Sequence, residues 1–171
     1  MSDTLDSSNW PGHDFSAAAC IDGIYGLGDA DWSFCNSNTG QTNPWLSIQI
    51  PTGSFVDHVL VYARSDCCSR FLSPYEVYVG DVSGDPVSGG LTRCGLINYP
   101  PNTVGPHSVD CELVGSYVTL RLPFTDRMIA IDGASHRVSV DSCACARKPD
   151  DRSCGCVLRC VITQLAALVT C

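Results

Sequence analysis

The sequence VDHVLVYARSDCC, from Val56 to Cys68, joins an apolar run to a charged end with two adjacent cysteines. Its first part, Val56 to Tyr62, is nearly continuous in apolar and β-branched residues, which predicts a β-strand buried on both faces. The strand is followed directly by Arg64, Asp66 and the pair Cys67 and Cys68. We therefore expect a buried strand that leads into a chemically distinctive loop.

The two adjacent cysteines allow two interpretations. Bonded to each other, they form a rigid, apolar plate of sulfur, and Arg64 beside them supplies planar hydrogen-bond donors that Asp66 holds in place. An apolar plate with oriented donors suits a sugar, which has an apolar C–H face and a ring of hydroxyls. Bonded to two separate partners, the cysteines are ordinary disulfides beside a salt bridge at the end of a strand.

Other strand-like runs occur between residues 43 and 131, separated by turn signals. In Trp45 to Ile50, apolar and polar residues alternate as in a half-buried strand, and Pro51-Thr52-Gly53 is expected to end it. Residues 83–106 hold four of the ten prolines and are expected to form a long surface loop. Several short strands without helical periodicity predict an antiparallel sandwich or barrel. The remaining predicted strands are Tyr75–Val79, Tyr117–Leu122 and Arg127–Ile131.

Composition excludes several classes of partner. Hydrophobic residues make up 44% of the 171 residues and charged residues 16%, as in a globular chain. The formal net charge is −8, and the ten Lys and Arg residues form no run, which argues against binding to nucleic acid. No segment is apolar over the length of a membrane span, so we expect no membrane insertion.

The cysteine content indicates an oxidising compartment. Twelve cysteines are rare in a cytosolic chain of this size, so we expect an extracellular, secreted protein with disulfide bonds. The N-terminus, Met1 to Asp6, has neither a basic region nor an apolar run of the kind found in a signal peptide. We therefore expect the sequence to be truncated at its N-terminus.

No motif in the sequence indicates catalysis. The chain contains no G-x-S-x-G elbow, no H-E-x-x-H motif and no phosphate-binding glycine loop. Its four histidines are scattered, and no pair of carboxylates is marked as an acid and a base. We expect a binding protein and not an enzyme.

A family resemblance favours the sugar interpretation. The order N-P-W (residues 43–45), V-x-V-Y (59–62), R-x-D-C-C (64–68) and E-V-Y-V-G-D (76–81) resembles the F-type, fucose-binding lectins. Ala19-Cys20-Ile21-Asp22-Gly23 and Gly115-Ser116-Tyr117-Val118 fit the same family, and the resemblance covers residues 2 to 132. It implies an all-β, discoidin-like jelly-roll β-sandwich, usually extracellular, that binds L-fucose near a structural calcium.

The resemblance also implies roles for individual residues. Arg64 would donate to the sugar, Asp66 would orient Arg64, and the Cys67–Cys68 disulfide would pack on the sugar. Two positions depart from the family: Ser37 stands where a sugar-binding histidine is expected, and Phe71 where a second basic residue is expected, with Arg70 one place earlier. The fucose motif is thus degenerate. The implied sugar-binding residues are Ser37, Arg64, Asp66, Cys67, Cys68 and Arg70.

The same comparison implies a calcium site and two further disulfides. The closing Cys-Glu pair of the family's last strand is replaced by Asp132-Gly133, which leaves Cys35 to pair with Cys20. Cys94 and Cys111 would form the remaining disulfide. Oxygen ligands suit calcium; here they would be the side chains of Asp22, Ser33 and Asp132 and the carbonyls of Ala19 and Ile24.

Composition changes near residue 141. Residues 1–140 are expected to form the F-type-lectin-like domain, and residues 141–171 a small cysteine-rich C-terminal tail whose six cysteines form disulfides or bind zinc. A third interpretation is that the residues beyond about 133 are not a genuine continuation, because Gly133-Ala134-Ser135-His136 interrupts the expected last strand. The expected partners are fucosylated glycans, and weak sites of this kind gain avidity when the chain is a homo-oligomer. The alternatives are a discoidin-like adhesion or structural module that has lost sugar binding, or a part of a larger extracellular protein.

Overall fold

The computed structural model describes residues 15–20, 34–64, 67–100, 103, 105–132, 137–140 and 161–162. Within these residues no helix is long and apolar enough to cross a membrane. The described residues form eight strands and two single-turn helices, in chain order: η2 (Ala17–Cys20), β1 (Phe34–Asn36), β2 (Trp45–Val61), α1 (Ser69–Leu72), β3 (Tyr75–Gly80), β4 (Thr92–Ile97), β5 (His107–Arg121), β6 (Ala130–Asp132), β7 (Arg137–Val140) and β8 (Val161–Ile162).

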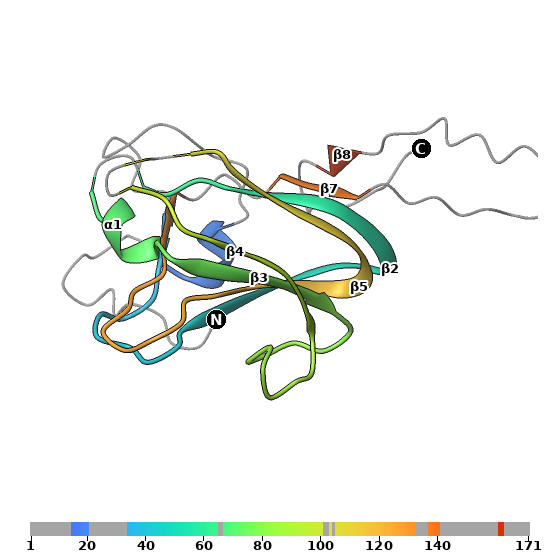
Figure 1. Cartoon of the computed structure of the whole chain (residues 1–171), viewed down its shortest axis with the longest axis horizontal. Helices are drawn as coiled ribbons and strands as arrows, with labels where there is room; N and C mark the ends of the chain where they lie inside the picture. Colours follow the sequence, from blue (N-terminus) through green and yellow to red (C-terminus); the bar gives the residue numbers. More distant parts are fainter. Residues whose placement is uncertain are drawn as a thin grey trace, which may run out of the picture.

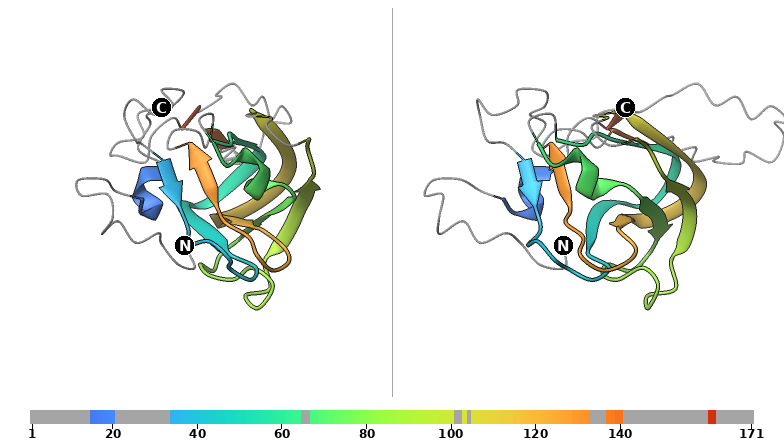
Figure 2. Two further views of the ribbon diagram at one scale, coloured as in Figure 1. Left: turned by 90° about the vertical axis from the view of Figure 1, so that its left-hand side faces the viewer. Right: turned by 60° about the vertical axis from the view of Figure 1, so that its left-hand side comes forward.

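The strands form two antiparallel sheets, as predicted for an all-β sandwich. The larger sheet has the order β4-β3-β5-β2-β7-β8, and the smaller sheet pairs β1 with β6. β2 and β5 are the longest strands and bend together along their length (Figure 1). Figure 2 shows β1 and β6 as a separate layer beside the larger sheet. Two residues of the cysteine-rich tail, Val161–Ile162, form β8 and pair with β7.

The predicted alternation in the first part of β2 is confirmed. Leu46, Ile48 and Ile50 are buried, while the residues between them are partly or fully exposed. The predicted break at residues 51–53 is wrong, because β2 continues through it with a shift in register against β5 between Gln49 and Ser54. Gly53 supplies a left-handed backbone (φ 73°) at this bend.

The second part of β2 is buried on one face and not on both. Val56, Val59 and Val61 are buried, but the residues between them are partly exposed. A second irregularity lies between Val56 and His58 and changes the phase of the alternation, so that valines three residues apart face the same core. A bulge of this kind makes a half-buried strand look continuous in the sequence.

The core is filled by side chains from both sheets and from α1. Fully buried members include Val56, Val61, Leu72, Tyr75, Val77, Leu122, Ile129 and Ile131. The loop predicted over residues 83–106 contains the edge strand β4, which the Cys94–Cys111 disulfide ties to β5. β5 begins at His107, ten residues before the predicted strand, and the last predicted strand is the short β6.

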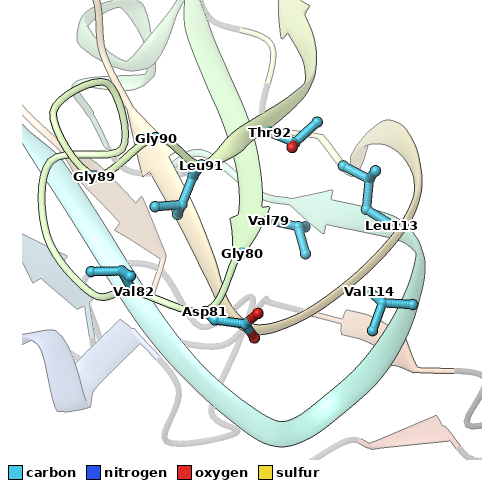
Figure 3. A pocket seen from close by; sticks show the side chains of 10 residues that line it. All are labelled: Val79, Gly80, Asp81, Val82, Gly89, Gly90, Leu91, Thr92, Leu113 and Val114. Carbon is cyan, nitrogen blue, oxygen red and sulfur yellow. The ribbon is translucent and has the colours of Figure 1, made fainter.

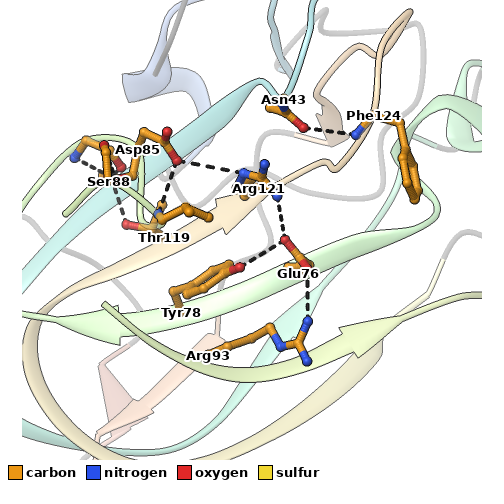
Figure 4. Close-up of polar contacts among 12 residues, drawn as sticks. Asn43, Glu76, Tyr78, Asp85, Ser88, Arg93, Thr119, Arg121 and Phe124 are labelled. Atoms are coloured by element: carbon orange, nitrogen blue, oxygen red, sulfur yellow. Dashed lines mark hydrogen bonds and ion pairs between the residues drawn. The ribbon is translucent and has the colours of Figure 1, made fainter. Parts of the chain in front are cut away.

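The outer face of the large sheet carries a polar cluster centred on Glu76. Arg121 Nη1 donates to Glu76 at 2.7 Å, and Arg93 Nη1 and the Tyr78 hydroxyl each donate at 3.0 Å (Figure 4). Glu76 is 8% exposed. Burial alone would raise the pKa of the Glu76 carboxyl, but the hydrogen bonds from Arg121, Tyr78 and Arg93 outweigh it, so that this pKa is lowered.

Candidate functional site

Arg64 lies at the end of β2, where the two sheets approach each other. The preceding residue, Ala63, forms an isolated bridge with Ile131, which ties the segment after β2 to β6. The Arg64 guanidinium carbon lies 3.4 Å from the centroid of the Phe34 ring in β1. The Asn36 side-chain amide is oriented so that its nitrogen donates to the Cys35 carbonyl. In this orientation Arg64 Nη1 donates to the Asn36 side-chain oxygen at 3.0 Å. Arg64 is 7% exposed, so its guanidinium is held in one orientation.

The segment beneath Arg64 is fixed by packing and by a disulfide. Phe34 stacks on Phe15 with a centroid distance of 5.2 Å, and both rings are buried. Cys35, between Phe34 and Asn36, is bonded to Cys20 of η2, the pair that the family resemblance implies. Because both neighbours of Arg64 belong to this fixed strand, its guanidinium is preorganised and loses little freedom on binding a ligand.

Cys67 and Cys68 are bonded to each other, which realises the first of the two interpretations of the adjacent cysteines. Cys67 is exposed and Cys68 is partly exposed, so the disulfide is a surface feature. Cys68 adopts a left-handed backbone (φ 68°) as the N-cap of α1, and its carbonyl accepts a hydrogen bond from the Phe71 amide at 2.9 Å. The disulfide and α1 thus form one continuous turn.

Arg70 lies on α1 and is exposed. Its guanidinium carbon lies 4.6 Å from the centroid of the Phe71 ring. Phe71 occupies the position at which the family resemblance expects a second basic residue, so the contact brings the charge of Arg70 over that position. The charge of Arg70 therefore lies close to the Phe71 position, although Arg70 is one residue earlier in the sequence.

Ser37 is fully buried, with 0% exposure. Its hydroxyl donates to the Asn38 carbonyl at 3.1 Å and accepts from the Ile129 amide at 2.9 Å. The hydroxyl is therefore used to join the segment after β1 to the segment before β6. This placement removes Ser37 from the candidate sugar contacts.

Several of the residues expected in the site lie outside the described part of the chain. These are Asp66 and, from the calcium set, Asp22, Ile24 and Ser33, together with the side chain of Asp132. Ala19, the remaining member of the calcium set, is buried in η2. Within the described residues, no group of three or more His, Cys, Asp or Glu side chains is arranged to hold a metal ion.

A cavity of about 290 Å³ lies elsewhere, at the C-terminal end of β3. Figure 3 shows its lining, which includes Val79, Asp81, Leu91, Leu113 and Val114. α1 precedes the other end of the six-residue β3, and an extended strand of this length spans about 20 Å. The cavity is therefore separate from α1 and from the Cys67–Cys68 disulfide that precedes α1.

Two residues of the site were not found by sequence reasoning. Phe34 and Asn36 orient Arg64, but they come from a three-residue strand that is distant in the sequence. A strand this short has no recognisable periodicity, and only its pairing with β6 places it beside Arg64.

Comparison with known proteins bears on the fold. No protein-family model matches the chain, and no curated protein is significantly similar to it. A fucolectin from striped bass (Morone saxatilis) serum is similar in structure with a TM-score of 0.58 and 26% identity, over 68% of this chain and 39% of that chain. The lectin domain of lectinolysin, solved with Lewis b antigen, has a TM-score of 0.54 and 17% identity over 68% of this chain and 79% of that chain. A fucose-binding module of Streptococcus pneumoniae has a TM-score of 0.53 and 18% identity over 69% and 79%.

The chain has the F-type lectin fold. The discoidin-like jelly-roll sandwich that the R-x-D-C-C motif implies is thus confirmed. This chain spans about two fifths of the striped bass fucolectin, at 39% of its length. In this F-type lectin fold, Arg64 follows β2 in the chain, next to the bridge between Ala63 and Ile131, and the vicinal disulfide begins three residues after Arg64.

Proposed function

We propose that this chain is a carbohydrate-binding lectin for fucosylated glycans and that it makes and breaks no bonds. The observation that carries the proposal is the exposed Cys67–Cys68 disulfide, three residues from a guanidinium held by Phe34 and Asn36. The likeness to a fucolectin and to fucose-binding lectin modules supports the same ligand class.

Each part of the proposed site has a physical role. The disulfide presents an apolar surface on which the C–H face of a sugar can pack. Arg64 provides charge-assisted hydrogen bonds to the sugar oxygens, which are roughly twice as strong as neutral ones. Asp66, two residues after Arg64, is proposed to hold this guanidinium, and Arg70 to provide the second cation.

The proposed setting is extracellular. Three disulfides are consistent with an oxidising compartment, and the similar striped bass fucolectin is a serum protein. A shallow site with few polar contacts binds one sugar weakly, so we propose that the protein acts on clustered glycans, where several sites bind together and raise the avidity.

A glycan-array screen of the oxidised protein tests the proposal, with Arg64→Lys as the diagnostic variant. Lysine keeps the charge but loses the planar set of donors, so the loss of one charge-assisted hydrogen bond predicts at least about tenfold weaker binding. Arg93→Lys is the matched control, because Arg93 is on the edge strand β4 and is about half exposed.

Three results are informative. Fucosylated glycans that bind the wild type and Arg93→Lys, but not Arg64→Lys, support the proposal. Equal binding by both variants would show that sugar is bound elsewhere. An empty array from protein with a cooperative unfolding transition would overturn the lectin function and favour an adhesion or structural module.

We also propose a structural calcium ion, held by Ala19, Asp22, Ile24, Ser33 and Asp132. A ligand that binds only the folded state raises the melting temperature. Calcium is expected to raise this temperature and excess chelator to reverse the rise. An identical transition with calcium and with chelator would contradict the calcium proposal without affecting the sugar site.

A further inference from the structure

The turn that carries the disulfide cannot hold its own shape. α1 contains four residues, Ser69–Leu72, and helices of fewer than about 12 residues are marginal without tertiary support. Its own hydrogen bond, from the Phe71 amide to the Cys68 carbonyl, closes a single turn. The position of the disulfide therefore depends on what holds α1 from outside.

Tyr99 holds the N-terminal end of α1. Its hydroxyl donates to the Ser69 carbonyl at 3.2 Å, in a buried position one residue after Cys68. The Tyr99 main chain is tied to Ser73, the residue after α1: the Tyr99 amide donates to the Ser73 hydroxyl at 3.0 Å, and this hydroxyl lies 3.2 Å from the Tyr99 carbonyl. One residue from the loop after β4 thus contacts both ends of α1.

The Tyr99 ring is itself held in place. It stacks on His107 with a centroid distance of 3.8 Å and an interplanar angle of 5°, and it meets Tyr75 edge-on at 6.2 Å. Tyr99 is 8% exposed, and burial raises the pKa of its hydroxyl to about 12, so the hydroxyl remains a donor at neutral pH. The packing leaves Tyr99 in one orientation.

Arg127 holds the C-terminal end of α1. Its Nη2 donates to the Leu72 carbonyl at 3.2 Å and to the Pro74 carbonyl at 2.8 Å. The carbonyls at the two ends of a short turn are thus satisfied by side chains from two distant segments. Of the two contacts, that of Tyr99 is nearer the disulfide.

We propose that Tyr99 is a positioning residue for the glycan site, acting through Ser69 on the Cys67–Cys68 disulfide. This inference rests on the proposed lectin function. The Tyr99 hydroxyl fixes the turn that carries the disulfide, so that the disulfide keeps its position relative to Arg64.

Tyr99→Phe tests the proposal, with Tyr75→Phe as the matched control. Both variants remove one hydroxyl from a buried ring. The Tyr75 hydroxyl is buried and has no hydrogen-bond partner among the described residues, whereas that of Tyr99 bonds to the Ser69 carbonyl. Two quantities are measured in each variant well below its melting temperature: the dissociation constant for a fucosylated glycan and the hydrogen-exchange rate of the Phe71 amide, followed by NMR.

Loss of one hydrogen bond predicts about two- to tenfold faster exchange and about two- to tenfold weaker glycan binding in Tyr99→Phe, and no change in Tyr75→Phe. Unchanged Phe71 exchange in Tyr99→Phe would overturn the proposal, as would faster exchange with unchanged affinity, which would mean a merely structural role. If the wild type binds no glycan, the proposed function fails, and the exchange rate alone decides whether Tyr99 holds the disulfide turn.

Discussion

Replacement of Glu76 by glutamine is expected to be one of the most destabilising single changes on the outer face of the large sheet. Glu76 accepts hydrogen bonds from Arg121, Arg93 and Tyr78 and is 8% exposed. In Glu76→Gln, one carboxylate oxygen becomes an amide nitrogen that cannot accept. Arg121 loses its closest charged partner and keeps only the longer ion pair with Asp85, in which Arg121 Nε lies 3.7 Å from Asp85 Oδ1.

The magnitude follows from the exposure of each partner. The Arg121 side chain is 14% exposed, and breaking such a buried pair costs about 3–5 kcal/mol. The Arg93 side chain is 54% exposed, and an exposed pair contributes about 0–1 kcal/mol. Because glutamine keeps one acceptor, we expect Glu76→Gln to cost about 2–4 kcal/mol and Arg93→Ala less than about 1 kcal/mol.

The effect has a defined pH dependence. The pKa of Glu76 is lower in the folded state than in the unfolded state, where it is about 4.3. The contribution of the Glu76 carboxylate to the free energy of unfolding is therefore fully present above the unfolded pKa and is lost as pH falls through the folded pKa. The difference in stability between wild type and Glu76→Gln should shrink as pH falls below about 4.

Urea unfolding followed by circular dichroism, at neutral and acid pH with the disulfides intact, measures these differences. A cost for Glu76→Gln no larger than that for Arg93→Ala at neutral pH would show that the buried Glu76–Arg121 pair contributes no more to stability than the exposed Glu76–Arg93 pair. A difference between wild type and Glu76→Gln that stays constant with pH would show that the carboxylate charge is not what matters.

Two further changes separate structural residues from binding residues. Ser37→Ala should lower the free energy of unfolding by about 1–3 kcal/mol, because it leaves the buried Ile129 amide without its acceptor. The glycan affinity of this variant, measured by titration, should be unchanged. Lost affinity at unchanged stability would return Ser37 to the sugar site. Removing the Cys94–Cys111 disulfide (Cys94→Ala/Cys111→Ala), whose cysteines are 17 residues apart, should lower the free energy of unfolding by about 3 kcal/mol in urea titrations, and an unchanged unfolding midpoint would contradict this estimate.

Local patterns predicted the parts of the fold that have one buried face and regular pairing. The alternation of Leu46, Ile48 and Ile50 is such a case. The break expected at residues 51–53 did not occur, because pairing with β5 continues beyond a bend and overrides the local turn signal. β4 was missed because it is an edge strand with no buried residue, so that it lacks an apolar pattern.

For a similar reason, the sequence predicted only the part of the site that is local in the chain. Arg64, Cys67 and Cys68 are close in the sequence, and their residue types allow a vicinal disulfide beside a donor, which the family resemblance then favoured over two separate disulfides. Phe34, Asn36 and Tyr99 support them from distant segments, and no local pattern marks such contacts. Ser37 was assigned by position, and only its burial shows that its hydroxyl serves the main chain.

Saturation-transfer NMR with methyl α-L-fucoside, with methyl α-D-glucoside as the control sugar, tests whether the Cys67–Cys68 disulfide binds fucose. We expect the wild type to saturate the ring C–H and methyl protons of the fucoside, and this saturation to be lost in Cys67→Ser/Cys68→Ser, because these protons pack on the disulfide. Equal saturation by the wild type and this double variant, or none by the folded wild type, would show that the disulfide does not bind fucose.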